Sequence, residues 1–167
     1  MITVRRIRIG EALLFKQMRL ASLRESPSAF SSTFESAQLR SPESWSEQAD
    51  STAQGSDQST FIAFSGDSPI GIAALYTSGQ GTGVGELLQV WVSPEYRGQG
   101  AAIDLMDAVF QWAAENGFRT VVAAVTKNNP RALRFYREYG FTPANRASLD
   151  APDDAVVLMK QVEYALH

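Results

Sequence analysis

The chain of 167 residues has a formal net charge of −3, with 44% hydrophobic and 20% charged residues, and this balance predicts a single globular domain over 1–167. It has no cysteine, and its one histidine is the last residue, His167. These counts exclude a disulfide framework and a cysteine nucleophile, and they argue against a Ser–His–Asp triad and a histidine metal site, so we expect no metal. The acidic balance argues against nucleic-acid binding.

Neither a secretory signal nor a membrane segment is visible in the sequence. The first residues, MITVRRIRIG, contain arginines, but no apolar segment of the signal-peptide type follows them. No run reaches the length of about 20 apolar residues that a membrane helix needs. We therefore expect a cytoplasmic protein without a membrane partner.

The elements expected in the first half of the chain are, in order, a strand over 2–9, a helix over 11–25, a short helix after Ser41-Pro42, and strands over 60–65 and 70–77. Serine followed by proline is typical of a helix N-terminus. The two apolar strands flank Gly66-Asp67-Ser68-Pro69, which predicts a hairpin. The polar segment 26–59 is the least informative part.

The elements expected in the second half are strands over 86–93 and 119–126, helices over 101–116 and 131–139, and two closing strands over 141–149 and 155–163. The continuous apolar run over 119–126 is typical of a strand buried on both faces. Ile103 and Met106 share the apolar face of the first of these helices, and this face is predicted to be buried.

A glycine-bearing turn between residues 93 and 101 is a candidate phosphate site. The first N–H groups of a helix lack internal partners and carry partial positive charge. Gly98 and Gly100 would let an anion approach the backbone, and Arg97 adds a charge. An ordinary strand–helix turn would explain the same residues. The turn is not a P-loop, because no lysine follows a glycine, nor a dinucleotide fingerprint, because Ile103 replaces the third glycine.

Two blocks of residues resemble the signatures of the GCN5-related N-acetyltransferase (GNAT) family. The first block is Arg97-x-x-Gly100-x-Ala102. The second is Asn129-x-x-Ala132-x-x-x-Tyr136-x-x-x-Gly140-Phe141. Both have the spacing of the family, with one helix and one strand between them. The resemblance is specific over residues 84–141 and weak over 26–59.

The resemblance implies an α/β (α+β) GNAT fold, with a mixed, mostly antiparallel, twisted sheet of six to seven strands flanked by helices. Strand four, over 86–93, would carry a bulge and splay from strand five to open a V-shaped cleft. Acetyl-coenzyme A would bind there as a co-substrate. Its contacts would be the strand edge at Val90, Trp91 and Val92, and the cradle of Arg97, Gly98, Gln99, Gly100, Ala101 and Ala102.

The resemblance also implies direct acetyl transfer to an amine in a ternary complex. Tyr136 would protonate the leaving sulfur, because a phenol with a pKa of about 10 keeps its proton at neutral pH; alternatively it is a packing residue. Asn129 would contact the coenzyme or cap its helix. The base would be Glu86 or water, and without that role Glu86 is a surface carboxylate at a strand end.

The expected acceptor is a primary amine on a small molecule. Relatives that acetylate ribosomal-protein N-termini carry a glutamate where this chain has Ala124, although a protein or peptide amine stays an alternative. The acidic residues that dominate 26–70 would suit a polyamine. Phe30, Phe34 and Trp45 either line the acceptor channel or pack in the core. A non-catalytic coenzyme-A-binding module is a further alternative, and a homodimer is possible.

Overall fold

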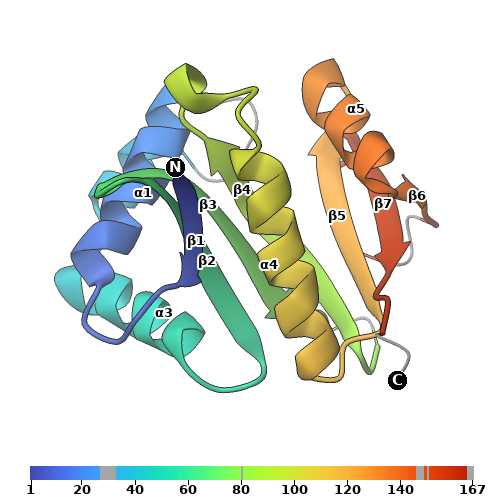
Figure 1. Ribbon diagram of the computed structural model, residues 1–167, viewed down its shortest axis with the longest axis horizontal. Coiled ribbons are helices and arrows are strands. Elements are labelled where there is room, and N and C mark those ends of the chain that lie inside the picture. Colours follow the sequence, from blue (N-terminus) through green and yellow to red (C-terminus); the bar gives the residue numbers. More distant parts are fainter. Residues whose placement is uncertain (27–32, 80, 146–148, 150, 165–167) are drawn as a thin grey trace.

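Among the described residues, seven strands form one mixed sheet (Figure 1). The computed structural model describes residues 1–26, 33–79, 81–145, 149 and 151–164. The strands are β1 (Ile2–Arg6), β2 (Gln58–Ser65), β3 (Ser68–Thr77), β4 (Val84–Val92), β5 (Thr120–Thr126), β6 (Thr142–Pro143) and β7 (Ala155–Gln161). Their order is β1-β2-β3-β4-β5-β7-β6, and every neighbouring pair is antiparallel except β4 and β5. The mostly antiparallel α/β architecture is thereby confirmed.

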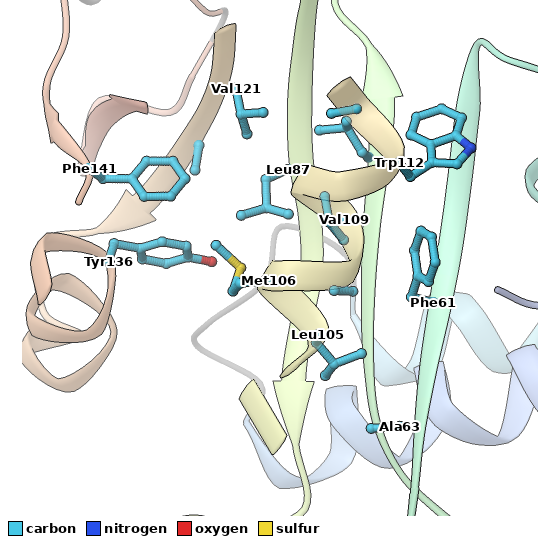
Figure 2. Close-up of a cluster of buried hydrophobic side chains, with 14 of the residues drawn as sticks. Phe61, Ala63, Leu87, Leu105, Met106, Val109, Trp112, Val121, Tyr136 and Phe141 are labelled. Carbon is cyan, nitrogen blue, oxygen red and sulfur yellow. The ribbon is translucent and has the colours of Figure 1, made fainter. Parts of the chain in front are cut away.

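Helices cover both faces of this sheet. They are α1 (Ala12–Glu25), α2 (Phe34–Gln38), α3 (Pro42–Ala53), α4 (Ala101–Glu115) and α5 (Pro130–Tyr139). Phe61 of β2 packs in one core cluster with Met106 of α4 (Figure 2). The next residue, Ile62, packs in the other cluster with Phe15 of α1 and Trp45 of α3. Because strand side chains alternate, α4 lies on one face and α1 with α3 on the other. No helix of the described ranges is long and apolar enough to cross a bilayer.

The predicted start of the helix after residue 41 is confirmed. The Ser41 side chain accepts a hydrogen bond from the Ser44 N–H at 3.1 Å, and Pro42 is the first residue of α3. The prediction missed α2, whose single buried residue, Ala37, gives no readable apolar period. The first strand was predicted to reach residue 9 but ends at Arg6.

The predicted strand over 141–149 is wrong in extent. Only Thr142 and Pro143 pair with β7, as β6. Proline has no N–H to donate, which disfavours a longer ladder. Leu149, which suggested a strand, instead packs against Val122 and Val157. Residues 146–148 and 150 lie outside the described residues.

The bulge and the splay implied for strand four are both present in β4. Gln89 and Val90 stand opposite the single residue Ala73 of β3, and Gln89 has a positive φ of 64°. The parallel pairing with β5 ends at Glu86. Beyond this residue the two strands diverge, as the upper half of Figure 1 shows.

Candidate active site

A cavity of about 400 Å³ lies beside the diverging end of β4. Its walls come from the end of β4, the turn with the 3-10 segment Pro94–Tyr96, the start of α4, and α5. Most residues that the sequence predicted for the site line it: Val90, Trp91, Val92, Arg97, Gly98, Gly100, Ala101, Ala102, Asn129 and Tyr136. Gln99 is exposed outside it, with its amide nitrogen 3.4 Å from the Glu95 carbonyl oxygen. Glu86 lies further back along β4.

The cavity wall also contains residues that the sequence analysis did not assign to the site: Ser26, Tyr96, Ile103, Arg131, Ala132 and Phe135. Ile103 was expected in the core, but it is 51% exposed because the first turn of α4 faces the cavity. Arg131 brings a second guanidinium to the cavity, and it directly follows Pro130 at the start of α5. Its place at the start of α5, five residues before Tyr136, was the sequence signal that could have identified Arg131 as a site residue.

The N-terminus of α4 is open toward this cavity. Gly100 is the N-cap residue in a left-handed conformation with a φ of 90°, and no described side chain caps the helix. A Cβ added at Gly98 or Gly100 would meet no atom within 4 Å. The first N–H groups of the helix are therefore accessible to an anion, which the helix dipole also favours.

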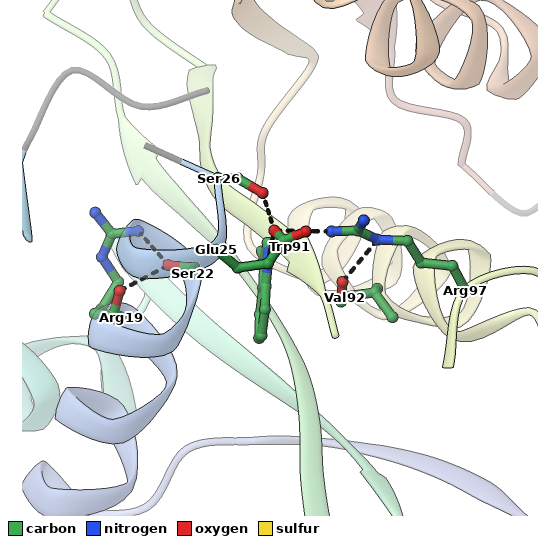
Figure 3. A network of polar contacts seen from close by, with 7 residues as sticks. All are labelled: Arg19, Ser22, Glu25, Ser26, Trp91, Val92 and Arg97. Carbon is green, nitrogen blue, oxygen red and sulfur yellow. Dashed lines mark hydrogen bonds and ion pairs between the residues drawn. The ribbon is translucent and has the colours of Figure 1, made fainter. Parts of the chain in front are cut away.

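Arg97 is held beside this helix end by a polar network (Figure 3). Its Nε donates to the Val92 carbonyl oxygen at 2.9 Å, and a terminal nitrogen lies 3.1 Å from Glu25 Oε2. The indole N–H of Trp91 donates to the same carboxylate oxygen at 2.9 Å. Burial raises the pKa of Glu25, but the hydrogen bonds from Trp91 and Arg97 and the charges of Arg97 and Arg131 outweigh this effect and lower it overall.

Tyr136 lies at the other side of the cavity, on α5. Its ring is 8% exposed and makes edge-to-face contacts with Phe135 and Phe141, at centroid distances of 5.7 and 5.2 Å. Burial raises the pKa of this phenol above its usual value of 10. The hydroxyl therefore keeps its proton and can act as a proton donor. Asn129 caps α5, since its Oδ1 accepts the Ala132 N–H at 3.3 Å.

Glu86 stands where β4 and β5 part, opposite Val122 of β5 and directly across from Tyr76 of β3. Its neighbour Leu87 packs on the α4 face, so Glu86 and Tyr76 point to the face covered by α1 and α3. The Tyr76 hydroxyl accepts a hydrogen bond from Gln48 of α3 at 2.9 Å. The two candidate catalytic residues thus approach the split from opposite faces of the sheet.

Two of the three aromatic residues considered for the acceptor channel pack in the core cluster under α1 and α3. Trp45 is 2% exposed, and Phe34 packs against the edge of that cluster. Trp45 also lines a second cavity. Phe30 lies outside the described residues.

Residues 21–141, well over half of the chain, match the Acetyltransferase (GNAT) family. The split sheet and the open helix end are thus found in a chain that belongs to this family, as the two sequence blocks predicted.

Two curated relatives support this assignment. The uncharacterized N-acetyltransferase YobR of Bacillus subtilis is 33% identical over 72 residues, which are 43% of this chain and 29% of its own length. The uncharacterized N-acetyltransferase Rv2669 of Mycobacterium tuberculosis is 43% identical over 56 residues, 34% of this chain and 36% of its own. The chain thus spans about a third of the length of the curated relatives it matches.

Solved structures share the whole fold at lower sequence identity. A GNAT-family acetyltransferase from Streptococcus pneumoniae superposes with a TM-score of 0.78 and 17% identity, over 98% of this chain and 100% of that chain. PaiA N-acetyltransferase from Thermoplasma acidophilum, in complex with coenzyme A, has a TM-score of 0.67 and 17% identity, over 96% and 99% of the two chains.

Proposed function

We propose that this protein transfers the acetyl group of acetyl-coenzyme A to the primary amine of a small molecule. The observation that carries the proposal is the cavity at the β4–β5 split, which joins an uncapped helix N-terminus, two arginines and a buried phenol. The coenzyme A complex of the PaiA neighbour supports the same ligand for this fold.

The cavity suits the coenzyme at both of its ends. The pyrophosphate would lie on the first N–H groups of α4, with Arg97 and Arg131 as the nearby cations. The pantetheine arm would follow the edge of β4 at Val90 and Val92, which β5 leaves unpaired beyond Glu86. This route would bring the thioester to the point where the two strands part.

Acetyl-coenzyme A supplies the thioester, and side chains of the protein donate one proton and accept another. The amine nitrogen bonds to the carbonyl carbon, the carbon–sulfur bond breaks, and the amine loses a proton as the sulfur gains one. Tyr136 donates the proton to the sulfur, because its raised pKa keeps it protonated. Glu86, directly or through water, accepts the proton of the amine from the opposite face.

The acceptor reaches this site from the face covered by α1 and α3. A second cavity of about 290 Å³ lies among the helices on that face, and its size suits a small molecule better than a folded protein surface. We also propose that the protein works in the cytoplasm, and a homodimer is compatible with this activity.

Two measurements on the purified chain test the proposal. Calorimetry with coenzyme A should show one site per chain, and thiol release from acetyl-coenzyme A should accelerate with at least one member of a panel of amino acids, polyamines, aminoglycosides and peptides. Binding without thiol release for any amine would identify a non-catalytic coenzyme-binding module instead. Absence of coenzyme binding would refute the proposal outright.

A further inference from the structure

The side chain of Tyr76 lies beside the proposed base, and the chemistry of acetyl transfer gives it no role. Tyr76 belongs to β3 and stands directly opposite Glu86 of β4, within contact reach of it. Its neighbour Leu75 packs in the core cluster under α4, so Tyr76 points to the face covered by α1 and α3, as Glu86 does. Because the pairing of β4 with β5 ends at Glu86, Tyr76 is next to the point where the two strands part.

The hydroxyl of Tyr76 keeps a hydrogen that it can donate. Gln48 of α3 donates from Nε2 to the Tyr76 oxygen at 2.9 Å, so this bond does not use the phenolic hydrogen. Among the hydrogen bonds that join described residues, none has the Tyr76 hydroxyl as its donor. A tyrosine hydroxyl both accepts and donates. It is therefore able to donate to an acceptor atom of a bound molecule.

This hydroxyl is also a neutral group at neutral pH. Burial raises the pKa of Tyr76 above its usual value of 10, and the hydrogen bond from Gln48 and the charges of Arg19 and Arg40 offset only part of this effect. The phenol therefore keeps its proton under the conditions in which Glu86 would accept one from an amine.

The second cavity leaves room for a small molecule near the same hydroxyl. Arg19 and Arg40 are both in the wall of this cavity of about 290 Å³, and the charges of both act on Tyr76. Trp45, one turn before Gln48 on α3, belongs to the same wall. Tyr76 thus lies near Glu86 on one side and near this cavity on the other.

The lengths of the two opposite side chains indicate which part of a substrate meets the hydroxyl. A tyrosine side chain is longer than that of glutamate, so the Tyr76 hydroxyl reaches farther from the sheet than the Glu86 carboxylate. An amine held at Glu86 would therefore bring its neighbouring carbon atoms to the hydroxyl. An aliphatic chain there would displace water and leave a half-buried donor unpaired, whereas an oxygen would accept its hydrogen.

We propose that Tyr76 is a specificity-determining residue whose hydroxyl donates to an oxygen close to the acceptor amine, so that the substrate is an amino alcohol or an amino sugar. The proposal rests on the proposed function and narrows its substrate class. Gln48 holds the hydroxyl in place through the phenolic oxygen. A polyamine, which the acidic residues of 26–70 would suit, has no oxygen and would leave the Tyr76 hydrogen unpaired.

The test compares amines that differ by one oxygen. Ethanolamine is assayed beside propylamine, methoxyethylamine beside butylamine, and vicinal aminocyclohexanol beside cyclohexylamine, and kcat/KM is measured by thiol release at saturating acetyl-coenzyme A. If none of these pairs reacts, the most active acceptor of the amine panel and its analogue without the oxygen take their place, and an acceptor with no oxygen near its amine overturns the inference.

The quantity that decides is the change in the ratio of the two kcat/KM values between proteins, because an oxygen also makes the amine itself less basic. Tyr76→Phe keeps the ring and removes the donor. We expect it to lower the ratio of the oxygen-bearing amine to its match by about three- to tenfold, the worth of one hydrogen bond, in at least one pair. The KM for acetyl-coenzyme A should stay the same.

A second variant and a control accompany this change. The carboxylate in Gln48→Glu can only accept, so it would take the Tyr76 hydrogen from the substrate and lower the ratio while the hydroxyl stays. Tyr139→Phe is the control, because this half-buried tyrosine on α5 donates to Asp107 at 2.6 Å, and its loss should leave the ratio unchanged. Thermal unfolding shows whether each variant folds, and Gln48→Glu carries the test if Tyr76→Phe does not.

The outcomes separate this inference from the proposed function. The same ratio in the parent protein, Tyr76→Phe and Gln48→Glu would overturn the oxygen contact and leave acetyl transfer intact, and so would an equal fall in Tyr139→Phe. If no amine releases thiol, acetyl transfer is refuted, and calorimetry of the same pairs then decides. A preference for the oxygen-bearing amine that Tyr76→Phe removes would support the contact, and any other result would overturn it.

Discussion

The role of the α4 N-terminus in binding an anion can be tested with the two glycines that flank this helix. Gly100 precedes its first turn with a φ of 90°, and Gly117 follows its last turn with a φ of 82°. A Cβ added at either position would meet no atom within 4 Å. Alanine at the two sites therefore imposes the same backbone strain without a steric clash, but only Gly100 lines the cavity.

The expected effects on stability and on binding differ between the two variants. An L-residue in the left-handed region costs about 1–2 kcal/mol, so both Gly100→Ala and Gly117→Ala should lower the free energy of unfolding by that amount. At Gly100 the added methyl group also stands before the first N–H groups of α4. The loss of one hydrogen bond to a charged phosphate, about 1.5–3 kcal/mol, should raise the Kd for coenzyme A by about 10- to 150-fold.

Calorimetry with coenzyme A and denaturant unfolding of both variants measure these quantities. Gly117→Ala should bind coenzyme A like the parent protein, despite its lowered stability. Equal Kd values for the two variants would refute the placement of the phosphate cradle at this helix. A rise in Kd for both would show that the effect follows stability rather than contact.

Three further changes test the other residues of the site. Tyr136→Phe should lower kcat by about 10²- to 10⁴-fold with an unchanged Kd for coenzyme A, whereas Tyr139→Phe, whose hydroxyl donates to Asp107 at 2.6 Å, should not change kcat; equal kcat values would remove the acid role. Because burial raises the pKa of Tyr136, the neutral phenol stabilises the fold fully below pH 10, and this contribution should be lost only as pH rises further. Glu86→Gln should remove the acidic limb of the pH–rate profile, and an unaltered profile would leave water as the base. Glu25→Gln should tighten coenzyme binding by up to about fivefold, because a partly exposed ion pair of about 1 kcal/mol no longer holds Arg97; weaker binding would show that the carboxylate orients it.

Much of the local structure was predictable because its causes are local. The serine before Pro42 caps α3, and Gly140 ends α5 with a φ of 117°, as their residue types indicate. The two sequence blocks ending at Ala102 and Phe141 indicated the family, and most of their residues lie at one cavity. Where tertiary packing decided instead, prediction failed: Ile103 faces the cavity, and β6 is reduced to two residues.

The second cavity was beyond prediction for a different reason. Arg19 lies on α1 and Arg40 lies between α2 and α3, so the two arginines of its wall are 21 positions apart in the chain. Net charge along a segment says nothing about which side chains point inward. Only the packing of α1, α2 and α3 brings Arg19 and Arg40 to the wall of one cavity.

The sequence by itself excluded thiol chemistry for this chain and argued against a histidine triad and a histidine metal site, and it predicted an anion cradle and a tyrosine in a recognisable spacing. These conclusions depend on residue types and on neighbours within a few turns. The tertiary structure alone decided that the pairing of β4 with β5 ends at Glu86, and that Glu86 and Tyr136 lie toward opposite faces of the sheet at this split. Such facts depend on strand register and helix docking, which join residues far apart in the chain.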